Sequence, residues 1–216
     1  MPTVTSLFLL SEPAWHGLRA RRLPAIPAAM YPWIRDRGSL TRRLLQACHH
    51  GVLQVQVLDQ RLVRPLPSER LRLGTPGPQL AWVREVLLTC SEQPWVFART
   101  VIPWRSLTGA AAPLARAGSR PLGEMLFAVP GTERRALEVA RLRPGDALHR
   151  AASVALRQAP GGLWGRRTLF GYRGAPLLVN EIFLPGLPAA AASERTEGGH
   201  PCIASRSGRW RRLARR

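Results

Sequence analysis

The chain has 216 residues and a mass of 23.9 kDa, which suits one domain with a tail. Its composition, 45% hydrophobic and 21% charged, excludes a globally disordered chain, and no apolar run approaches the ~20 residues of a membrane-spanning helix. The net charge of +19 comes from arginine alone: residues 189–216 hold 7 arginines and 2 glutamates (net +5), and the other 188 residues hold 25 arginines and 11 acids (net +14). This dispersed charge predicts only weak, salt-dependent attraction to polyanions, so we expect no specific nucleic-acid partner and no membrane insertion.

The first fifty residues predict a loose segment followed by two helices. Residues 1–28 are rich in proline and arginine and lack periodicity, so we expect a poorly structured N-terminal segment. A short helix is expected over residues 31–37. Ser39 is a favourable N-cap for a second helix over 40–48, in which leucines recur at helical spacing.

Strands are expected in the middle of the chain. From Val52 onward apolar residues alternate with polar ones, which predicts a half-buried strand. Residues 65–79 are a proline-rich connection. The clearest hairpin pairs residues 81–90 with 95–102 across a turn at 91–94.

The second half of the chain continues this mixture. We expect a short helix over residues 121–127, a strand over 134–142 and an alanine-rich helix over 146–158. A second hairpin pairs residues 163–170 with 176–184 across a glycine-containing turn.

These elements predict the fold class and the domain limits. Strands joined mainly by hairpins, with helices between them, are typical of an α+β domain on an antiparallel β-sheet with flanking helices. We assign residues 29–187 to this single domain. Residues 188–216 are rich in Ala, Gly, Ser and Arg, and we expect a disordered arginine-rich tail there.

Three charged residues interrupt apolar stripes of the predicted strands: Arg84, Arg99 and Glu181. Residues two apart in a strand share a face, and at that spacing the neighbours of each charge are apolar. A buried charge without a partner is costly. Arg84 and Glu181 either pair with each other or face a cavity and bind a ligand that carries a carboxylate and a hydroxyl. Spacing alone leaves both interpretations open and slightly favours the first.

The cysteines and histidines predict no further chemistry. Three widely spaced cysteines indicate neither a disulfide framework nor a zinc site, so we expect reduced thiols. His49 and His50 lie beside Cys48, but no further ligands follow at metal spacing. The run Leu7-Phe8-Leu9-Leu10 lacks the basic residues and cleavage site of a signal peptide, so we expect a cytoplasmic protein. The three cysteines are Cys48, Cys90 and Cys202.

Five motifs across residues 81–185 carry a family resemblance. They are Trp82-Val83-Arg84-Glu85-Val86-Leu87-Leu88, Pro94-Trp95 with Ala98-Arg99-Thr100-Val101-Ile102-Pro103, Pro121-Leu122-Gly123, Gly162-Leu163-Trp164-Gly165-Arg166-Arg167 and Pro176-Leu177-Leu178-Val179-Asn180-Glu181-Ile182-Phe183-Leu184-Pro185. In this order they resemble the chorismate pyruvate-lyases. The resemblance is weaker over residues 31–70, where it rests on Gly38-Ser39-Leu40-Thr41-Arg42-Arg43, and absent from 1–28 and 187–216.

The resemblance implies a cytoplasmic, cofactor-free enzyme that converts chorismate to 4-hydroxybenzoate and pyruvate, the first committed step of ubiquinone biosynthesis. It also implies a buried internal site in which Arg84 binds the ring carboxylate, Leu40 and Leu122 contribute backbone contacts, and Glu181 meets the product hydroxyl. Because these include the two charges singled out by strand parity, we favour the ligand interpretation and expect Arg84 and Glu181 to be catalytic.

Other features of the chain remain open at this stage. Arg99 is our candidate for the enolpyruvyl carboxylate, with a purely structural role as the alternative. Residues 144–160 resemble an insertion near the strand that precedes the site. We expect a monomer without metal. The rival functions are a non-catalytic effector-binding domain of the same fold, for which residues 1–28 are too short and proline-rich to supply the usual helix-turn-helix, and an arginine-rich nucleic-acid-binding protein.

Overall fold

The computed structural model describes residues 11–21, 23–75, 77–107, 109, 111–154, 156, 158–189 and 203–204. Its centre is one sheet with the strand order β1-β5-β6-β7-β4-β3-β2-β8. Neighbouring strands are antiparallel except β2 and β8, so the predicted single α+β domain on an antiparallel sheet is confirmed. The strands are β1 (His16–Gly17), β2 (Leu53–Val63), β3 (Ala81–Cys90), β4 (Gln93–Pro103), β5 (Glu133–Leu142), β6 (Leu163–Tyr172), β7 (Ala175–Phe183) and β8 (Ile203–Ala204).

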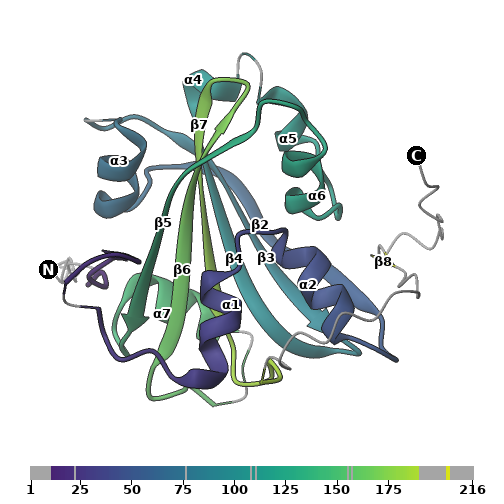
Figure 1. Ribbon diagram of the computed structural model, residues 1–216. Coiled ribbons are helices and arrows are strands. Elements are labelled where there is room, and N and C mark those ends of the chain that lie inside the picture. Colours follow the sequence, from purple (N-terminus) through teal and green to yellow (C-terminus); the bar gives the residue numbers. More distant parts are fainter. Residues whose placement is uncertain are drawn as a thin grey trace, which may run out of the picture.

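Helices cover both faces of the sheet. One face carries α1, α2, α5 and α6, which pack on Trp82, Val86 and Leu88 of β3 and on Phe170 of β6. The other face carries α3 and α7; in Figure 1, α3 and the pair α5–α6 flank the sheet from opposite sides. No helix of the described residues is both long and apolar enough to cross a membrane. The helices are η1 (Ala28–Met30), α1 (Tyr31–Arg35), α2 (Leu40–Ala47), α3 (Pro67–Leu73), α4 (Trp104–Leu107), α5 (Ala112–Ala115), α6 (Leu122–Phe127) and α7 (Ala147–Ser153).

Two tight turns bring the central strands together. Ser91 and Glu92 join β3 to β4 with φ of 46° and 69°, and Arg173 and Gly174 join β6 to β7 with φ of 48° and 83°. Positive φ at both turn residues gives a two-residue hairpin loop whose twist matches that of the flanking strands. The first hairpin is therefore tighter than the turn predicted at 91–94, and Pro94 lies within β4 beside a register shift, where a missing backbone N–H is tolerated.

Helix α3 lies within the segment that we predicted as a connection. Pro67 occupies its first turn, the carboxylate of Glu69 accepts from the backbone N–H of Leu66 at 2.9 Å, and Gly74 ends it in the left-handed conformation. These are ordinary start and stop signals for a helix. The density of prolines around them concealed the helix, because proline both begins helices and breaks them.

The N-terminal segment differs from our expectation. Strand β1 pairs with β5, and the ring of Trp15 lies 4.6 Å from the guanidinium carbon of Arg167. Leu18, Leu23 and Ile26 pack against the core. Residues 11–21 and 23–28 therefore belong to the folded domain, although their sequence shows no periodicity. Residues 1–10 lie outside the described residues.

The C-terminal boundary at residue 187 stays a prediction. Pro188 is still attached to the domain, because its carbonyl accepts from the indole N–H of Trp33 at 3.1 Å. Ile203 and Ala204 pair with β2. Residues 190–202 and 205–216 lie outside the described residues.

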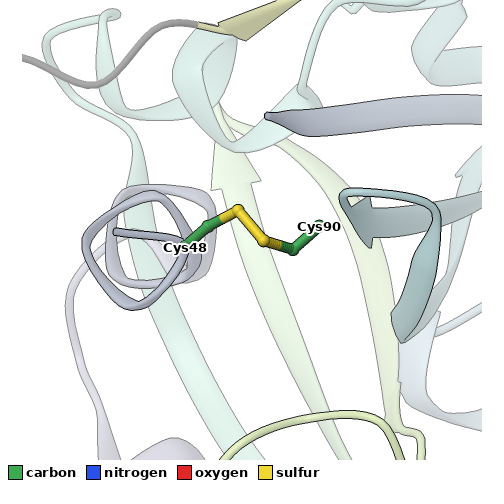
Figure 2. The surroundings of a disulfide bond; sticks show 2 residues. All are labelled: Cys48 and Cys90. Carbon is green, nitrogen blue, oxygen red and sulfur yellow. A yellow bond between two sulfur atoms is a disulfide. The ribbon is translucent and has the colours of Figure 1, made fainter. Parts of the chain in front are cut away.

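A disulfide joins Cys48 to Cys90, which corrects the expectation of reduced thiols (Figure 2). Cys48 follows α2, Cys90 ends β3, and their Cα atoms are 5.9 Å apart. The chain turns back after α2 into β2, whose Leu53 pairs with Cys90, so the register carries the two sulfurs together. Forty-two residues separate the pair, too far for sequence spacing to indicate it. Cys202 lies outside the described residues.

The insertion at 144–160 packs on the face of the sheet that carries α3. Its helix α7 packs through Leu148 and Ala152 against Leu87 and Phe97 on the opposite face of the sheet. Asp146 anchors the segment by accepting from the backbone N–H of Arg143 at 2.7 Å and the hydroxyl of Ser11 at 2.9 Å. Helix α7 and the helices α2 and α6 therefore lie on opposite faces of the sheet.

Candidate active site

A pocket lies between the sheet and the helices α2 and α6, lined by residues of β2–β7. Four of the five residues singled out from the sequence line it: Leu40, Arg84, Leu122 and Glu181. The strand register explains this meeting. Arg84 is opposite Thr100, Thr100 is opposite Val179, and Glu181 lies two residues further along the same face of β7.

Arg84 is a buried cation without a carboxylate partner among the described residues. It is 2% exposed, and its Nη2 donates to the backbone carbonyls of Gly118 at 2.7 Å and Arg120 at 3.2 Å. Its Nε is buried and has no hydrogen-bond partner. Burial lowers the pKa of Arg84 from 12.5 to about 10, so the guanidinium stays charged at neutral pH. A buried cation in this setting is stabilised by an anion that enters the pocket.

Glu181 forms an ion pair with Arg166 and not with Arg84. The Nε of Arg166 donates to the Glu181 carboxylate at 2.5 Å, and its Nη1 donates to the backbone carbonyls of Trp33 at 2.8 Å and Asp36 at 2.9 Å. The pairing of Arg84 with Glu181, which the sequence left open, is therefore absent. Arg166 holds the Glu181 carboxylate as a hydrogen-bond acceptor in the lining of the pocket.

Leu40 and Leu122 begin helices α2 and α6. The first backbone N–H groups of a helix have no acceptor within it, so both residues present backbone donors near the pocket. Gly123 allows the two helix starts to approach: a Cβ at this position would lie 3.1 Å from the hydroxyl of Thr41 and 3.4 Å from that of Ser39.

Arg99 lies on the face of the sheet opposite to that of Arg84, and it does not line the pocket. It is paired across the hairpin with Glu85, to which its Nη1 donates at 2.6 Å. The carboxylate of Glu69 accepts from its Nε at 2.9 Å and from its Nη2 at 3.2 Å. Burial disfavours the Arg99 cation, but Glu69 and Glu85 outweigh it and raise the pKa of Arg99. The geometry favours the structural role that we kept as the alternative.

Two further arginines line the pocket that we did not predict as site residues, Arg134 and Arg166. Arg166 shares a face of β6 with Trp164, Thr168 and Phe170, so the parity test that found Arg84 applies to it as well. Arg134 lies near the start of β5, before a register shift, where parity is not informative. Burial first and repulsion from Arg166 second lower the pKa of Arg134, which Glu181 and Asp36 partly offset.

The pocket combines cations at two places with one carboxylate between them. β5 and β6 supply Arg134 and Arg166, β7 supplies Glu181, and β3 supplies Arg84 beyond β4. Most of the remaining lining side chains are apolar, and Thr41 and Thr100 add two hydroxyls. Such a pocket fits a small apolar ring that carries negative charge at both ends and a hydroxyl toward the middle. The described residues contain no cluster of three metal-ligating side chains.

Comparison with known proteins identifies the family. The sequence profile of the chorismate lyase family matches residues 9–190. The chain belongs to the chorismate lyase family. A protein of Aromatoleum aromaticum, named a probable chorismate pyruvate-lyase, is 48% identical over 164 residues, which cover 75% of this chain and 88% of the relative. A protein of the same name from Methylococcus capsulatus is 43% identical and covers 73% of this chain and 96% of its own length.

Solved structures extend the likeness of fold to another class of protein. The C-terminal domain of the histidine utilization repressor from Pseudomonas syringae superposes with a TM-score of 0.51 at 11% identity, covering 68% of this chain and 99% of that domain. At this identity the likeness concerns the fold alone. The family assignment rests on the sequence matches.

Proposed function

We propose that this chorismate lyase family member converts chorismate to 4-hydroxybenzoate and pyruvate. The observation that carries the proposal is Arg84, a buried guanidinium that faces a pocket and has no carboxylate partner among the described residues. Chorismate is a dianion with one carboxylate on its ring and one on its enolpyruvyl side chain. Arg84 binds the ring carboxylate through a charge-assisted contact.

The opposite end of the ring meets Glu181. The Glu181 carboxylate, held by Arg166, accepts a hydrogen bond from the C4 hydroxyl. The backbone N–H groups of Leu40 and Leu122 are suited to contact the ring carboxylate of the substrate or of the product. These contacts fix one conformer of the substrate in a pocket that excludes much of the bulk water. Positioning of this kind supplies a large share of the rate for a reaction whose bonds are already in place.

The reaction is an elimination across C3 and C4 of the ring. The C4 proton leaves, its bonding pair forms the C3–C4 double bond, and the C3–O bond breaks with its electrons on oxygen. The ring becomes the aromatic 4-hydroxybenzoate, and the enolpyruvate takes up a proton and tautomerises to pyruvate. Aromatisation supplies the driving force, so the protein mainly orients the substrate and stabilises charge on the departing oxygen.

The non-catalytic alternative is an effector-binding domain. The fold resembles the C-terminal domain of a repressor, so the fold by itself allows this function. The family match over residues 9–190 and the identity to proteins named chorismate pyruvate-lyases favour the enzyme.

We further propose that the reaction takes place in the cytoplasm, without a cofactor, in a monomer, and that its product enters ubiquinone biosynthesis. Disulfides are rare in a reducing cytosol, so the bond between Cys48 and Cys90 would be an exception there. Cell fractionation with an antibody tests the compartment, and light scattering tests the oligomeric state.

Incubation of the purified chain with chorismate tests the proposed reaction. We expect 4-hydroxybenzoate and pyruvate to appear in equal amounts, measured by chromatography and by a coupled dehydrogenase assay. The matched control is Arg141→Ala, which removes one exposed arginine of β5 outside the pocket lining and should turn over chorismate normally. Binding of chorismate without turnover would identify an effector-binding domain, and absence of binding would refute both functions.

A further inference from the structure

A second carboxylate of the substrate needs a second cation, and the pocket offers two besides Arg84. Arg166 is occupied: its donors engage the carboxylate of Glu181 and the carbonyls of Trp33 and Asp36 at 2.5 to 2.9 Å. Arg134 is held differently. Its Nη2 donates to the carbonyl of Gly38 at 3.1 Å, and its Nη1 donates to that of Asp36 at 3.4 Å.

Arg134 has no ion-paired carboxylate among the described residues, and its Nε is buried without a hydrogen-bond partner. Long bonds to neutral carbonyls are weaker than the bidentate contact that a guanidinium makes with a carboxylate. An anion that enters the pocket therefore stabilises the guanidinium of Arg134 more than that of Arg166.

Two aromatic rings hold the Arg134 guanidinium in place. Its central carbon lies 5.6 Å from the ring centre of Phe127 and 5.3 Å from that of Phe170, and the two rings meet edge to face. Phe127 lines the pocket and is 44% exposed, so this cluster is at the mouth of the pocket. A guanidinium restrained on aromatic faces loses little side-chain freedom on binding a ligand.

The position of Arg134 matches the substrate side chain. The sheet order places Glu181 on β7 between Arg134 on β5 and Arg84 on β3. When the ring carboxylate meets Arg84 and the C4 hydroxyl meets Glu181, the C3 ether oxygen is one ring carbon away from Glu181 and distant from Arg84. The carboxylate of the side chain then lies on the side of the pocket that holds Arg134.

We infer that Arg134 binds the enolpyruvyl carboxylate of chorismate and holds the departing fragment, leaving the carbonyls of Asp36 and Gly38 as it does so. This inference rests on the proposed function and assigns to Arg134 the role that we expected of Arg99. It makes Arg134 a determinant of substrate over product, because 4-hydroxybenzoate has no second carboxylate.

Comparison of two ligands tests the inference. In Arg134→Gln, which keeps part of the stem on the aromatic rings, kcat/KM for chorismate should fall about 30-fold or more, as expected for the loss of one partner of a desolvated charge pair. The affinity for 4-hydroxybenzoate, measured by calorimetric titration, should change less than threefold. Arg134→Lys should recover part of the loss, and Arg141→Ala should leave both quantities unchanged.

The remaining outcomes separate this inference from the proposed function. Unaltered kcat/KM in Arg134→Gln would overturn the inference, as would an equal loss of affinity for chorismate and 4-hydroxybenzoate, which would mean that Arg134 only shapes the ring site. Retained affinity for 4-hydroxybenzoate shows that the variant is folded. Failure of the wild-type chain to convert chorismate would overturn the proposed function itself.

Discussion

Single residues of the pocket owe their function to charges that the fold leaves incompletely paired. Arg84 is 2% exposed and donates to two backbone carbonyls, whereas Arg99, which is also buried at 8% exposure, is paired with Glu69 and Glu85. An arginine is therefore the proposed ligand-binding group on one face of the sheet, and another arginine belongs to a structural ion pair on the other face. What distinguishes them is the presence of carboxylates, since a neutralised guanidinium has little to gain from a ligand.

Replacement of Arg84 should weaken both ligands of the site. In Arg84→Ala the ring carboxylate loses its charge-assisted partner, which typically costs about 2–5 kcal/mol, or thirty- to several-thousand-fold in affinity. Arg84→Lys should restore little, because an ammonium cannot reproduce the guanidinium fork. Calorimetric titration with 4-hydroxybenzoate measures the effect, and wild-type affinity in Arg84→Ala would remove this residue from the site.

Glu181→Gln separates orientation of the substrate from proton transfer. Glutamine still accepts a hydrogen bond from the C4 hydroxyl, so an orienting Glu181 predicts a ten- to hundredfold loss of turnover, against about 10²–10⁴-fold for the loss of a general base. We expect the smaller loss, because Arg166 already holds the Glu181 carboxylate.

Single-turnover rates of both forms between pH 5 and 9 decide this question. A loss beyond a thousandfold, with the acidic limb of the wild-type profile abolished, would identify Glu181 as the base. The thermal midpoint serves as the control, since the substitution also leaves the buried Arg166 without its carboxylate.

At the scale of elements, two contacts position the start and end of α2. Gly123 lets the beginning of α6 approach that of α2, and the disulfide ties the end of α2 to the end of β3. The two elements joined by the disulfide both line the pocket, α2 through Leu40 and β3 through Arg84. The disulfide itself does not line the pocket. It therefore acts on stability and only indirectly on the site.

Removal of the disulfide should lower stability more than activity. The double variant Cys48→Ser, Cys90→Ser removes a cross-link between residues 42 positions apart, so the unfolded chain gains conformational freedom. The expected loss of unfolding free energy is about 2–4 kcal/mol. Urea unfolding with and without reductant measures it, and kcat/KM at 25 °C should stay within threefold. Equal stability of the oxidised wild-type chain and the double variant would contradict this expectation. In denaturant without reductant, a thiol reagent should react with one thiol per wild-type chain, because the other two cysteines form the disulfide.

At the scale of the whole molecule, the pocket residues all precede the C-terminal tail. The last of them, Glu181, lies in β7. Beyond it, the carbonyl of Pro188 accepts from the indole N–H of Trp33, and Ile203 and Ala204 pair with residues of β2 that do not line the pocket. The positive charge of residues 189–216 adds to a surface that is already basic. The tail is therefore expected to matter little for the reaction.

Truncation after residue 189 should leave kcat/KM within tenfold of the full chain, a change of less than about 1.4 kcal/mol. The matched control is truncation after residue 186, which also removes Leu187 and Pro188 and leaves the buried indole N–H of Trp33 without its acceptor. We expect this shorter form to lose about 1–3 kcal/mol of unfolding free energy. A greater than tenfold loss of kcat/KM in the 189-residue form would place the tail at the site.

Features that depend on local periodicity could be predicted from the amino-acid sequence. Alternation along β3 and β7 pointed to Arg84 and Glu181, and turn and cap residues predicted both hairpins and helix α2, because side-chain direction in a strand and capping in a helix are set within a few residues. The family motifs supplied Leu40 and Leu122, which line the same pocket.

Features that depend on strand register and on partners distant in sequence became visible only in the folded chain. The pairing of Arg84 with Thr100 and of Glu85 with Arg99 assigns the two arginines to opposite faces, and no pattern within one strand contains that information. The disulfide joins residues that are 42 positions apart in sequence, and the ion pair of Arg166 with Glu181 joins residues 15 positions apart. Arg134, at the mouth of the pocket, lies 47 positions before Glu181 in the sequence. Such contacts form only when the strands have paired, because the register between strands sets which side chains meet.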